Sequence, residues 1–322
     1  MNTLAFPIQS QFTAAAARGV QVPRLQLKAG SLEEARRILC LKDEVLIEAG
    51  NKGSVLVGTY GLPKKSVQIA VFTDNGEFGA ACREMVACAE PAGGKPVVQI
   101  GTVASGALHG NGGKLWVGDL ACASSFIGHP QSALQEIGYF PQLWGDAKGA
   151  AQDEQYAFLD MWQRVYGGSF TIGGFLSLPC DSRVIAAIEA SAAGRNLKCN
   201  TSGCLSLETQ GAKLNGLAQQ LHDKLHVLTS SVGQMQDVFS ARLASAKFGI
   251  QVLYGFVSGV AWLSGNGSPL MPAPDQKVEA AKAAENAVLV AADALVRMAA
   301  ADRPEPSALL PADGPSGSFA ED

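Results

Sequence analysis

GAKLNGLAQQLHDKLHVLTSSVGQMQDVFSARLASAKFGIQVLYGFVSGVAWL, residues 211–263, is the stretch from which the architecture of this chain is predicted. Its first two thirds carry apolar residues at steps of three or four, which would place them along one stripe of a helix. These residues are Leu214, Leu217, Leu221, Leu225, Leu228, Val232, Met235 and Phe239. The spacing predicts one long amphipathic helix whose apolar stripe forms an interaction surface.

A second helix is predicted over residues 275–300, after a loop of small and turn-forming residues at 264–269. Its alanines would let two helices approach closely. The two helices together predict a long antiparallel hairpin at the C-terminus, either packed within the protein's own core or joined to other chains as a coiled coil. The internal bundle is the simpler interpretation.

Between these helices, residues 248–263 contain no charged side chain. The run is shorter than the roughly 20 apolar residues that span a bilayer, so we expect a buried core segment or a subunit contact. Membrane insertion after a conformational change and a constitutive span are the alternatives. Gly255 and Gly259 also have the spacing that permits close helix contact. The residues predicted to make the membrane or subunit contact are Phe248, Gly255, Phe256, Gly259 and Trp262.

The N-terminal half alternates between helical and strand patterns. Ser31 and Glu34 have the capping-box spacing, which predicts a short helix to about residue 41. Strands are predicted over runs rich in β-branched residues, and helices over the segments between turn signals. The predicted strands are 45–47, 54–59, 67–73, 97–103 and 114–121, the last two flanking a loop at 105–113, and the predicted helices are 77–89, 151–166 and one capped by Asp181.

These patterns predict an α+β protein with an N-terminal mixed α/β domain and a C-terminal helical hairpin. Four segments follow from them. They are an extended arm at 1–30, the mixed α/β domain at 31–205, the hairpin at 206–302, and a tail at 303–322 whose prolines, glycines and acids predict disorder.

Composition narrows the classes of partner. The chain of 322 residues has a net charge of −4 and 17% charged residues, and no basic run exceeds a pair such as Lys64-Lys65. Charge therefore predicts no nucleic-acid partner. The seven cysteines are an odd number and are widely spaced, and residues 1–17 show no secretory signal. We expect a reduced compartment such as the cytoplasm, with a virion as the alternative setting.

The strongest metal-binding pattern is His222-Asp223-Lys224-Leu225-His226. Two histidines four residues apart on a helix can bind one metal ion, with an acid beside them as a base. The simpler interpretation is that both histidines flank the apolar stripe. Cys180 before Asp181 is interpreted as a buried structural thiol rather than an activated one. The turn at 74–79 places two carboxylates where a dinucleotide pyrophosphate would approach, which disfavours nucleotide binding there.

No complete catalytic motif emerges, so the sequence favours a non-enzymatic assembly or interaction protein. It would be a virion, secretion-machine or similar structural component that self-associates through the C-terminal hairpin. One alternative is a metal-dependent hydrolase centred on His222 and His226. Another is a membrane-inserting, pore-forming type of protein that uses residues 248–263. No cofactor and no small-molecule substrate can be inferred from these patterns.

Overall fold

The structure is a computed structural model of the chain, and most of its core elements can be described. The described residues are 21–48, 54–63, 65–73, 79–90, 93–108, 114–128, 169–170, 176–207, 226–232, 234–265, 268–270 and 274–301. The predicted helix at 151–166, most of the N-terminal arm and the predicted tail lie outside them.

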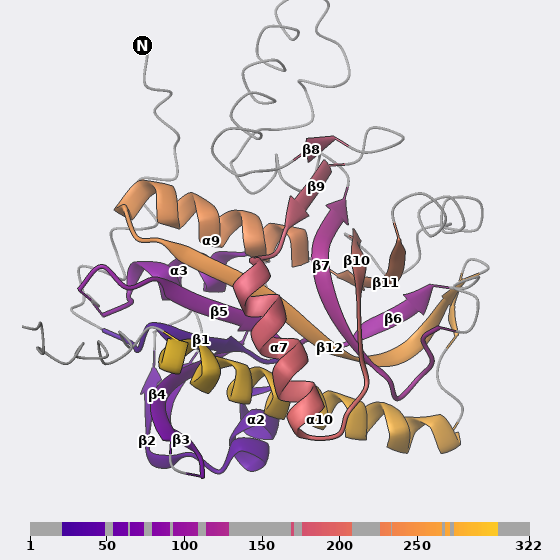
Figure 1. Cartoon of the computed structure of the whole chain (residues 1–322), viewed down its shortest axis with the longest axis horizontal. Coiled ribbons are helices and arrows are strands. Elements are labelled where there is room, and N and C mark those ends of the chain that lie inside the picture. Colours follow the sequence, from indigo (N-terminus) through magenta and orange to yellow (C-terminus); the bar gives the residue numbers. More distant parts are fainter. Residues whose placement is uncertain are drawn as a thin grey trace, which may run out of the picture.

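A single mixed sheet organises the described residues (Figure 1). Its thirteen strands are β1 (Leu25–Lys28), β2 (Lys42–Glu48), β3 (Ser54–Leu62), β4 (Lys65–Phe72), β5 (Val97–Gly101), β6 (Ser105–Leu108), β7 (Leu120–Gly128), β8 (Ser169–Phe170), β9 (Leu176–Pro179), β10 (Cys199–Leu207), β11 (Val227–Val232), β12 (Val252–Gly265) and β13 (Ser268–Leu270). The spatial order is β2-β3-β4-β1-β5-β12-β6-β11-β10-β7-β9-β8, with β13 beside β12. Because β12 also pairs with β7, strands β12, β6, β11, β10 and β7 close into a barrel.

Five helices of the described residues cover the sheet on two faces. They are α2 (Leu32–Leu39), α3 (Ala80–Ala87), α7 (Ser182–Gly194), α9 (Gln234–Phe248) and α10 (Pro274–Ala301). One apolar cluster joins α3 and α9 to one face, and a second joins α2, α7 and α10 to the other (Figure 1). The arrangement is an α/β fold with helices on both faces of a largely buried sheet.

The local predictions for the first half of the chain are largely confirmed. Ser31 caps α2 by accepting a hydrogen bond from the backbone N of Glu34 at 3.2 Å. Strands β2, β3 and β4 form two consecutive antiparallel pairs, and Asp181 caps α7. Two details differ, because the predicted loop at 105–113 begins with strand β6, and β7 starts at Leu120 rather than near residue 114.

The predicted long amphipathic helix is wrong in the part that the structure describes. Residues 227–232 form β11, which pairs in parallel with β10, and only then does α9 begin at Gln234. The apolar spacing misled because Leu228 is buried inside the barrel as part of a strand, whereas Met235 and Phe239 belong to the buried face of α9. A buried strand and a buried helix both carry apolar residues at three- and four-residue steps when neither has an exposed face.

The uncharged segment at 248–263 is mostly the central strand of the sheet, not the closed end of a hairpin. Strand β12 pairs with β5, β6, β7 and β13 over its fourteen residues. Leu253 and Val257 face the α10 side, and Tyr254 and Phe256 face the α9 side. The strand lacks charges because helices cover both of its faces, and an unpaired buried charge is costly. Among the described residues, no helix is long and apolar enough to cross a membrane.

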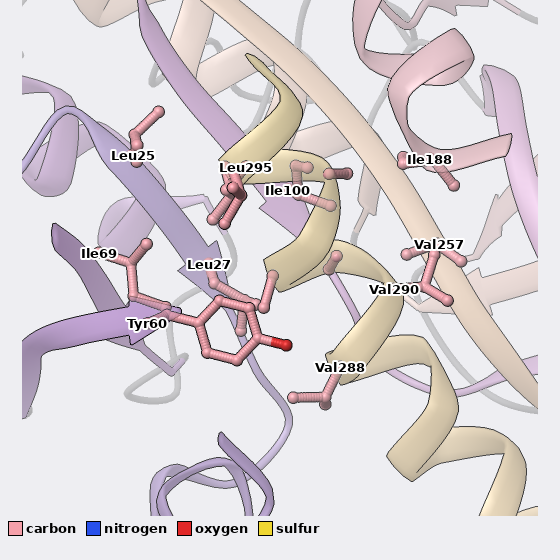
Figure 2. Packing of buried hydrophobic residues seen from close by; sticks show 14 of the residues in the cluster. Leu25, Leu27, Tyr60, Ile69, Ile100, Ile188, Val257, Val288, Val290 and Leu295 are labelled. Carbon is pink, nitrogen blue, oxygen red and sulfur yellow. The ribbon is translucent and has the colours of Figure 1, made fainter. Parts of the chain in front are cut away.

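The second C-terminal helix is confirmed as α10, but the hairpin is wrong because α9 and α10 lie on opposite faces of the sheet (Figure 1). Helix α10 packs against β12 so closely that a Cβ added at Gly259 would lie 2.5 Å from the backbone carbon of Ala283. Figure 2 shows Val288, Val290 and Leu295 of α10 among the buried side chains of the sheet. The alanines of α10 therefore allow close packing on a strand rather than on a partner helix.

Candidate functional site

Several polar side chains gather where parallel strands end and α9 begins. Parallel β1 and β5 end at Lys28 and Gly101, and parallel β10 and β11 end at Leu207 and Val232. Ligands of α/β proteins bind outside the carboxyl ends of such strands. We call the residues there the carboxyl-edge cluster, and its members are Lys28, Thr102, Ser206, Ser231, Gln234 and Asp237, all buried.

A fully buried ion pair lies at the centre of this cluster. The Lys28 ammonium donates to Asp237 Oδ2, and both side chains have 0% exposure. The other carboxylate oxygen, Oδ1, accepts the backbone N–H of Gly79 at 3.1 Å. Strand alternation turns Gln26 and Lys28 toward α3 and α9, because their neighbours Leu25 and Leu27 are in the cluster on the α10 side. The pair therefore ties β1, α9 and the residue before α3 to one point.

The end of β5 lies against the same pair. Thr102 donates both its backbone N–H and its hydroxyl to the carbonyl oxygen of Lys28, at 2.9 and 3.0 Å. A Cβ added at the preceding residue, Gly101, would be 2.9 Å from the Tyr254 hydroxyl and 3.6 Å from Gln234 Oε1. The absence of a side chain at Gly101 thus leaves room for the Tyr254 hydroxyl and the Phe256 ring, and the Gln234 amide oxygen lies close to the carboxyl end of β5.

The ends of β10 and β7 hold the first turn of α9. Ser206 Oγ accepts the backbone N–H of Met235 at 2.9 Å. A Cβ added at Gly128, the last residue of β7, would lie 2.8 Å from Met235 Sδ. Ser231 is the register partner of Ser206 in the parallel β10–β11 pair, and it is 1% exposed. The N-terminus of α9 is therefore fixed over the ends of three barrel strands.

Beneath the cluster, a layer of buried amides continues along the same face of the sheet. The Gln99 amide donates to Gln26 Oε1 at 2.8 Å and to the carbonyl of Cys82 at 2.9 Å. The Gln26 amide donates to the carbonyl of Met85 at 2.8 Å. These bonds join β1 and β5 to α3. The strands that position Lys28 and Thr102 are therefore held in register by side-chain hydrogen bonds as well as by the backbone hydrogen bonds between the strands.

The neighbouring thiols are not activated nucleophiles. Cys204 lies two residues before Ser206 and is fully buried, and burial raises its pKa to about 12. Burial also raises the pKa of Cys180 well above its ordinary range. Both thiols stay protonated at neutral pH, and the thiol is a far weaker nucleophile than the thiolate. The interpretation of Cys180 as a buried structural cysteine is confirmed.

The predicted interaction residues occupy the interior of the protein where the structure describes them. Leu228 is in β11, and Met235 and Phe239 are buried in α9. Val232 ends β11, whereas the predicted positions 214, 217, 221 and 225 lie outside the described residues.

The residues predicted for membrane or subunit contact lie in or beside β12. Phe256 packs edge-to-face on Phe126 with ring centroids 5.3 Å apart, and Gly255 and Gly259 lie under α7 and α10. Phe248 ends α9 half-buried, and Trp262 of β12 is also half-buried.

The helix that was to hold the metal pair does not include His226. This residue is exposed, has a φ of 51°, and directly precedes β11, and its carbonyl accepts the backbone N–H of Gly203 at 3.0 Å. His222 lies outside the described residues, so metal binding by the two histidines stays a prediction. Among the residues that the structure describes, no group of three or more His, Cys, Asp or Glu side chains could hold a metal ion.

Sequence reasoning missed all members of the carboxyl-edge cluster. One signal was available in Gln26 and Lys28, polar residues that alternate with leucines in a short strand pattern and so indicate a face with its own polar partners. A second was the β-branched run at 227–232 followed by Gly233, which indicates a strand that ends before a helix starts.

Solved structures of the same fold come from nucleoside-processing enzymes. Purine nucleoside phosphorylase from Toxoplasma gondii, in complex with immucillin-H, matches with a TM-score of 0.54 at 13% identity, covering 86% of this chain and 92% of that chain. Uridine phosphorylase from Vibrio fischeri matches with a TM-score of 0.53 at 12% identity, over 86% and 95% of the two chains. The 5′-methylthioadenosine/S-adenosyl homocysteine nucleosidase from Campylobacter jejuni gives a TM-score of 0.50 at 14% identity, over 85% and 97%.

At these identities the similarity shows the fold, which is the α/β fold of nucleoside phosphorylases and nucleosidases. No protein-family model matches the chain, and no curated protein matches it.

The fold overturns the predicted function. The prediction of a non-enzymatic assembly protein that self-associates through a helical hairpin is wrong, because the described helices α9 and α10 form no hairpin and the proteins that share the observed fold are enzymes by name. The inclination against an enzyme is wrong for the same reason. The metal-dependent hydrolase is also overturned as the function, because its motif required both histidines on one helix and His226 precedes a strand, whereas metal binding by the two residues stays a prediction. The membrane-inserting protein is overturned because residues 252–263 belong to the central strand. The expectation that no small-molecule substrate can be inferred is also wrong, because the solved structures that share this fold are named as nucleoside-processing enzymes.

Proposed function

We propose that this chain is an enzyme that cleaves the N-glycosidic bond of a nucleoside at the carboxyl-edge cluster. The observation that carries the proposal is the place of that cluster. Buried hydroxyl, amide and charged groups meet the N-terminus of α9 at the carboxyl ends of parallel strands, on a fold that other nucleosidases and nucleoside phosphorylases share.

The chemistry of the reaction fits neutral donors at this position. When the bond between the sugar C1′ and the base nitrogen breaks, the electron pair leaves with the base and the sugar gains oxocarbenium character. Water or phosphate then forms the new C1′–O bond on the sugar. Catalysis requires donors placed where negative charge develops on the base and a pocket that fixes the sugar. The Gln234 amide, the Ser231 hydroxyl and the positive end of α9 are donors of this kind.

The Lys28–Asp237 pair has a positioning role in this proposal. Its carboxylate is engaged by the Lys28 ammonium and by the N–H of Gly79, so it holds α9 and β1 together at the end of the strands. A buried polar network of this kind fixes neighbouring donors in one geometry when its members are paired. Gln234 lies one helical turn before Asp237 and would be held in place by it.

The test is product analysis with the purified full chain. Adenosine, guanosine, inosine, uridine, cytidine and 5′-methylthioadenosine would each be incubated with and without inorganic phosphate, and free base, free sugar and sugar 1-phosphate would be separated by chromatography. We expect free base from at least one nucleoside, and phosphate-dependent sugar 1-phosphate would identify a phosphorylase. No release of base and no saturable binding of any nucleoside by calorimetry would refute the proposal.

A matched pair of variants ties the activity to the cluster. Gln234→Met removes the amide at the start of α9 with little change of volume, and we expect kcat/KM to fall about 100-fold, the scale of losing one preorganised donor. Gln276→Met makes the same change in the first turn of α10 on the other face of the sheet and should leave kcat/KM unchanged. Equal effects of the two substitutions would move the active site away from α9.

A further inference from the structure

The N-terminus of α9 has a buried hydroxyl beside it that forms no hydrogen bond with any described residue. Helix α9 runs for fifteen residues, so its first N–H groups form a positive end that favours acceptors and developing negative charge. Among the described residues, Ser231 Oγ has no hydrogen-bond partner although the residue is 1% exposed. Buried hydroxyls in proteins are nearly always paired, so one without a partner at this place marks a position for a ligand atom.

Strand register places that hydroxyl on the α9 side. Ser231 and Ser206 are partners in the parallel β10–β11 pair, and partners in such a ladder carry their side chains on the same face of the sheet. Ser206 Oγ accepts the backbone N–H of Met235, the second residue of α9. The pair two residues earlier, Cys204 and Thr229, also has its side chains on one face, because they hydrogen-bond. The Ser231 hydroxyl thus lies beside the first turn of α9.

We infer that Ser231 and the first turn of α9 receive the carbonyl edge of the departing base, an inference that rests on the proposed function. The base leaves with the electron pair of the C1′–N bond, and its negative charge is shared with the carbonyl oxygens of the ring. Donors placed at those oxygens stabilise the transition state more than the substrate. The new C1′–O bond comes from water or phosphate, and the base takes up a proton from solvent after it leaves.

The charge state of the cluster points to the class of substrate. Its single carboxylate, Asp237, is already bound by Lys28 and the Gly79 N–H, and the other polar groups near Ser231 at the start of α9 are neutral hydroxyl, amide and backbone groups. Neutral donors suit a base that can leave as an anion with charge on oxygen, which describes a 6-oxopurine or a 2,4-dioxopyrimidine. An aminopurine lacks that carbonyl and needs a proton from an acid to leave. The preferred substrates are therefore nucleosides of oxo-bases such as inosine or uridine.

Ser231→Ala tests the inference against Ser202→Ala. Ser202 is a buried serine of β10 that lies four residues before Ser206, about 13 Å from it along the strand. Kinetics with inosine, uridine and adenosine would be combined with calorimetric titration of hypoxanthine, uracil and inorganic phosphate into each variant, and with thermal denaturation. We expect wild type to prefer an oxo-base nucleoside. Ser231→Ala should weaken binding of that free base at least 10-fold and lower kcat/KM at least as much, whereas Ser202→Ala should change neither.

The stability of the variant separates a binding role from a structural one. Because Ser231 Oγ has no partner among the described residues, Ser231→Ala should not lower the thermal midpoint, whereas loss of a structural hydrogen bond would. Turnover by wild type with unchanged base affinity in Ser231→Ala would overturn this inference and leave the proposed function standing. A loss of phosphate affinity in place of base affinity would also overturn it, as would a preference for adenosine. Failure of wild type to bind or cleave any nucleoside would refute the proposed function as well.

Discussion

Removing the carboxylate of Asp237 should greatly lower the free energy of unfolding of this protein, because it would leave the Lys28 ammonium buried without its partner. Lys28 and Asp237 have 0% side-chain exposure, and Asp237 also accepts the N–H of Gly79. Breaking one member of a buried pair costs about 3–5 kcal/mol. Since a domain has a total of about 5–15 kcal/mol, Asp237→Leu is expected to lose a large fraction of its unfolding free energy. Urea denaturation followed by circular dichroism measures that loss.

The double variant separates the buried charge from the packing at the same position. Lys28→Met with Asp237→Leu removes both charges and replaces them with apolar side chains of similar size, so we expect it to recover most of the stability lost by Asp237→Leu alone. Glu44→Gln is the surface control, because Glu44 pairs with an arginine whose side chain is 57% exposed, and its denaturation midpoint should match wild type. A loss below about 1 kcal/mol in Asp237→Leu, or a double variant less stable than either single one, would refute a buried pair that joins β1 to α9.

Two further predictions concern the packing of α10 and the ionisation of a buried thiol. Gly259→Ala should lower the free energy of unfolding, measured by urea denaturation, by about 1–3 kcal/mol or more, because its Cβ would lie 2.5 Å from the backbone of Ala283. Gly61→Ala should lower it less, because the nearest atom to its Cβ would be 3.7 Å away. Equal losses in the two variants would contradict the observed approach of α10 to β12. Burial raises the pKa of Cys204 to about 12, so its contribution to stability is complete below the unfolded value of about 8.5 and is lost as pH rises toward 12. Cys204→Ala should therefore reduce the alkaline decline of unfolding free energy by up to about 1.4 kcal/mol per pH unit, and an unchanged slope would show that the thiol ionises without opening the structure.

The sequence predicted the elements that local signals determine. The hydroxyl of Ser31 and the carboxylate of Asp181 cap helices within three residues of themselves, so their spacing was sufficient. The turn signals between β2, β3 and β4 likewise predicted three consecutive strands with at least two of them in a hairpin, and both consecutive pairs are antiparallel. These parts of the fold depend on contacts that are close in the chain.

The central part of the fold depends on contacts that sequence spacing does not encode. Strand β1 pairs in parallel with β4 and β5, and Lys28 meets Asp237 across 209 residues of chain. Residues 227–232 were predicted as helix and residues 248–263 as the closed end of a hairpin, because strands covered on both faces have no polar face to reveal their period. The candidate site was missed for the same reason, since its groups meet only after the strands are assembled in parallel.

A crystal structure of the full chain with a bound nucleoside would show directly whether the carboxyl-edge cluster binds the substrate. We expect density for the ligand at the carboxyl ends of β5, β10 and β11, with its base within hydrogen-bond distance of Ser231 Oγ and the first turn of α9. Clear density for the nucleoside on another surface, with the carboxyl-edge cluster unchanged and without ligand, would contradict it.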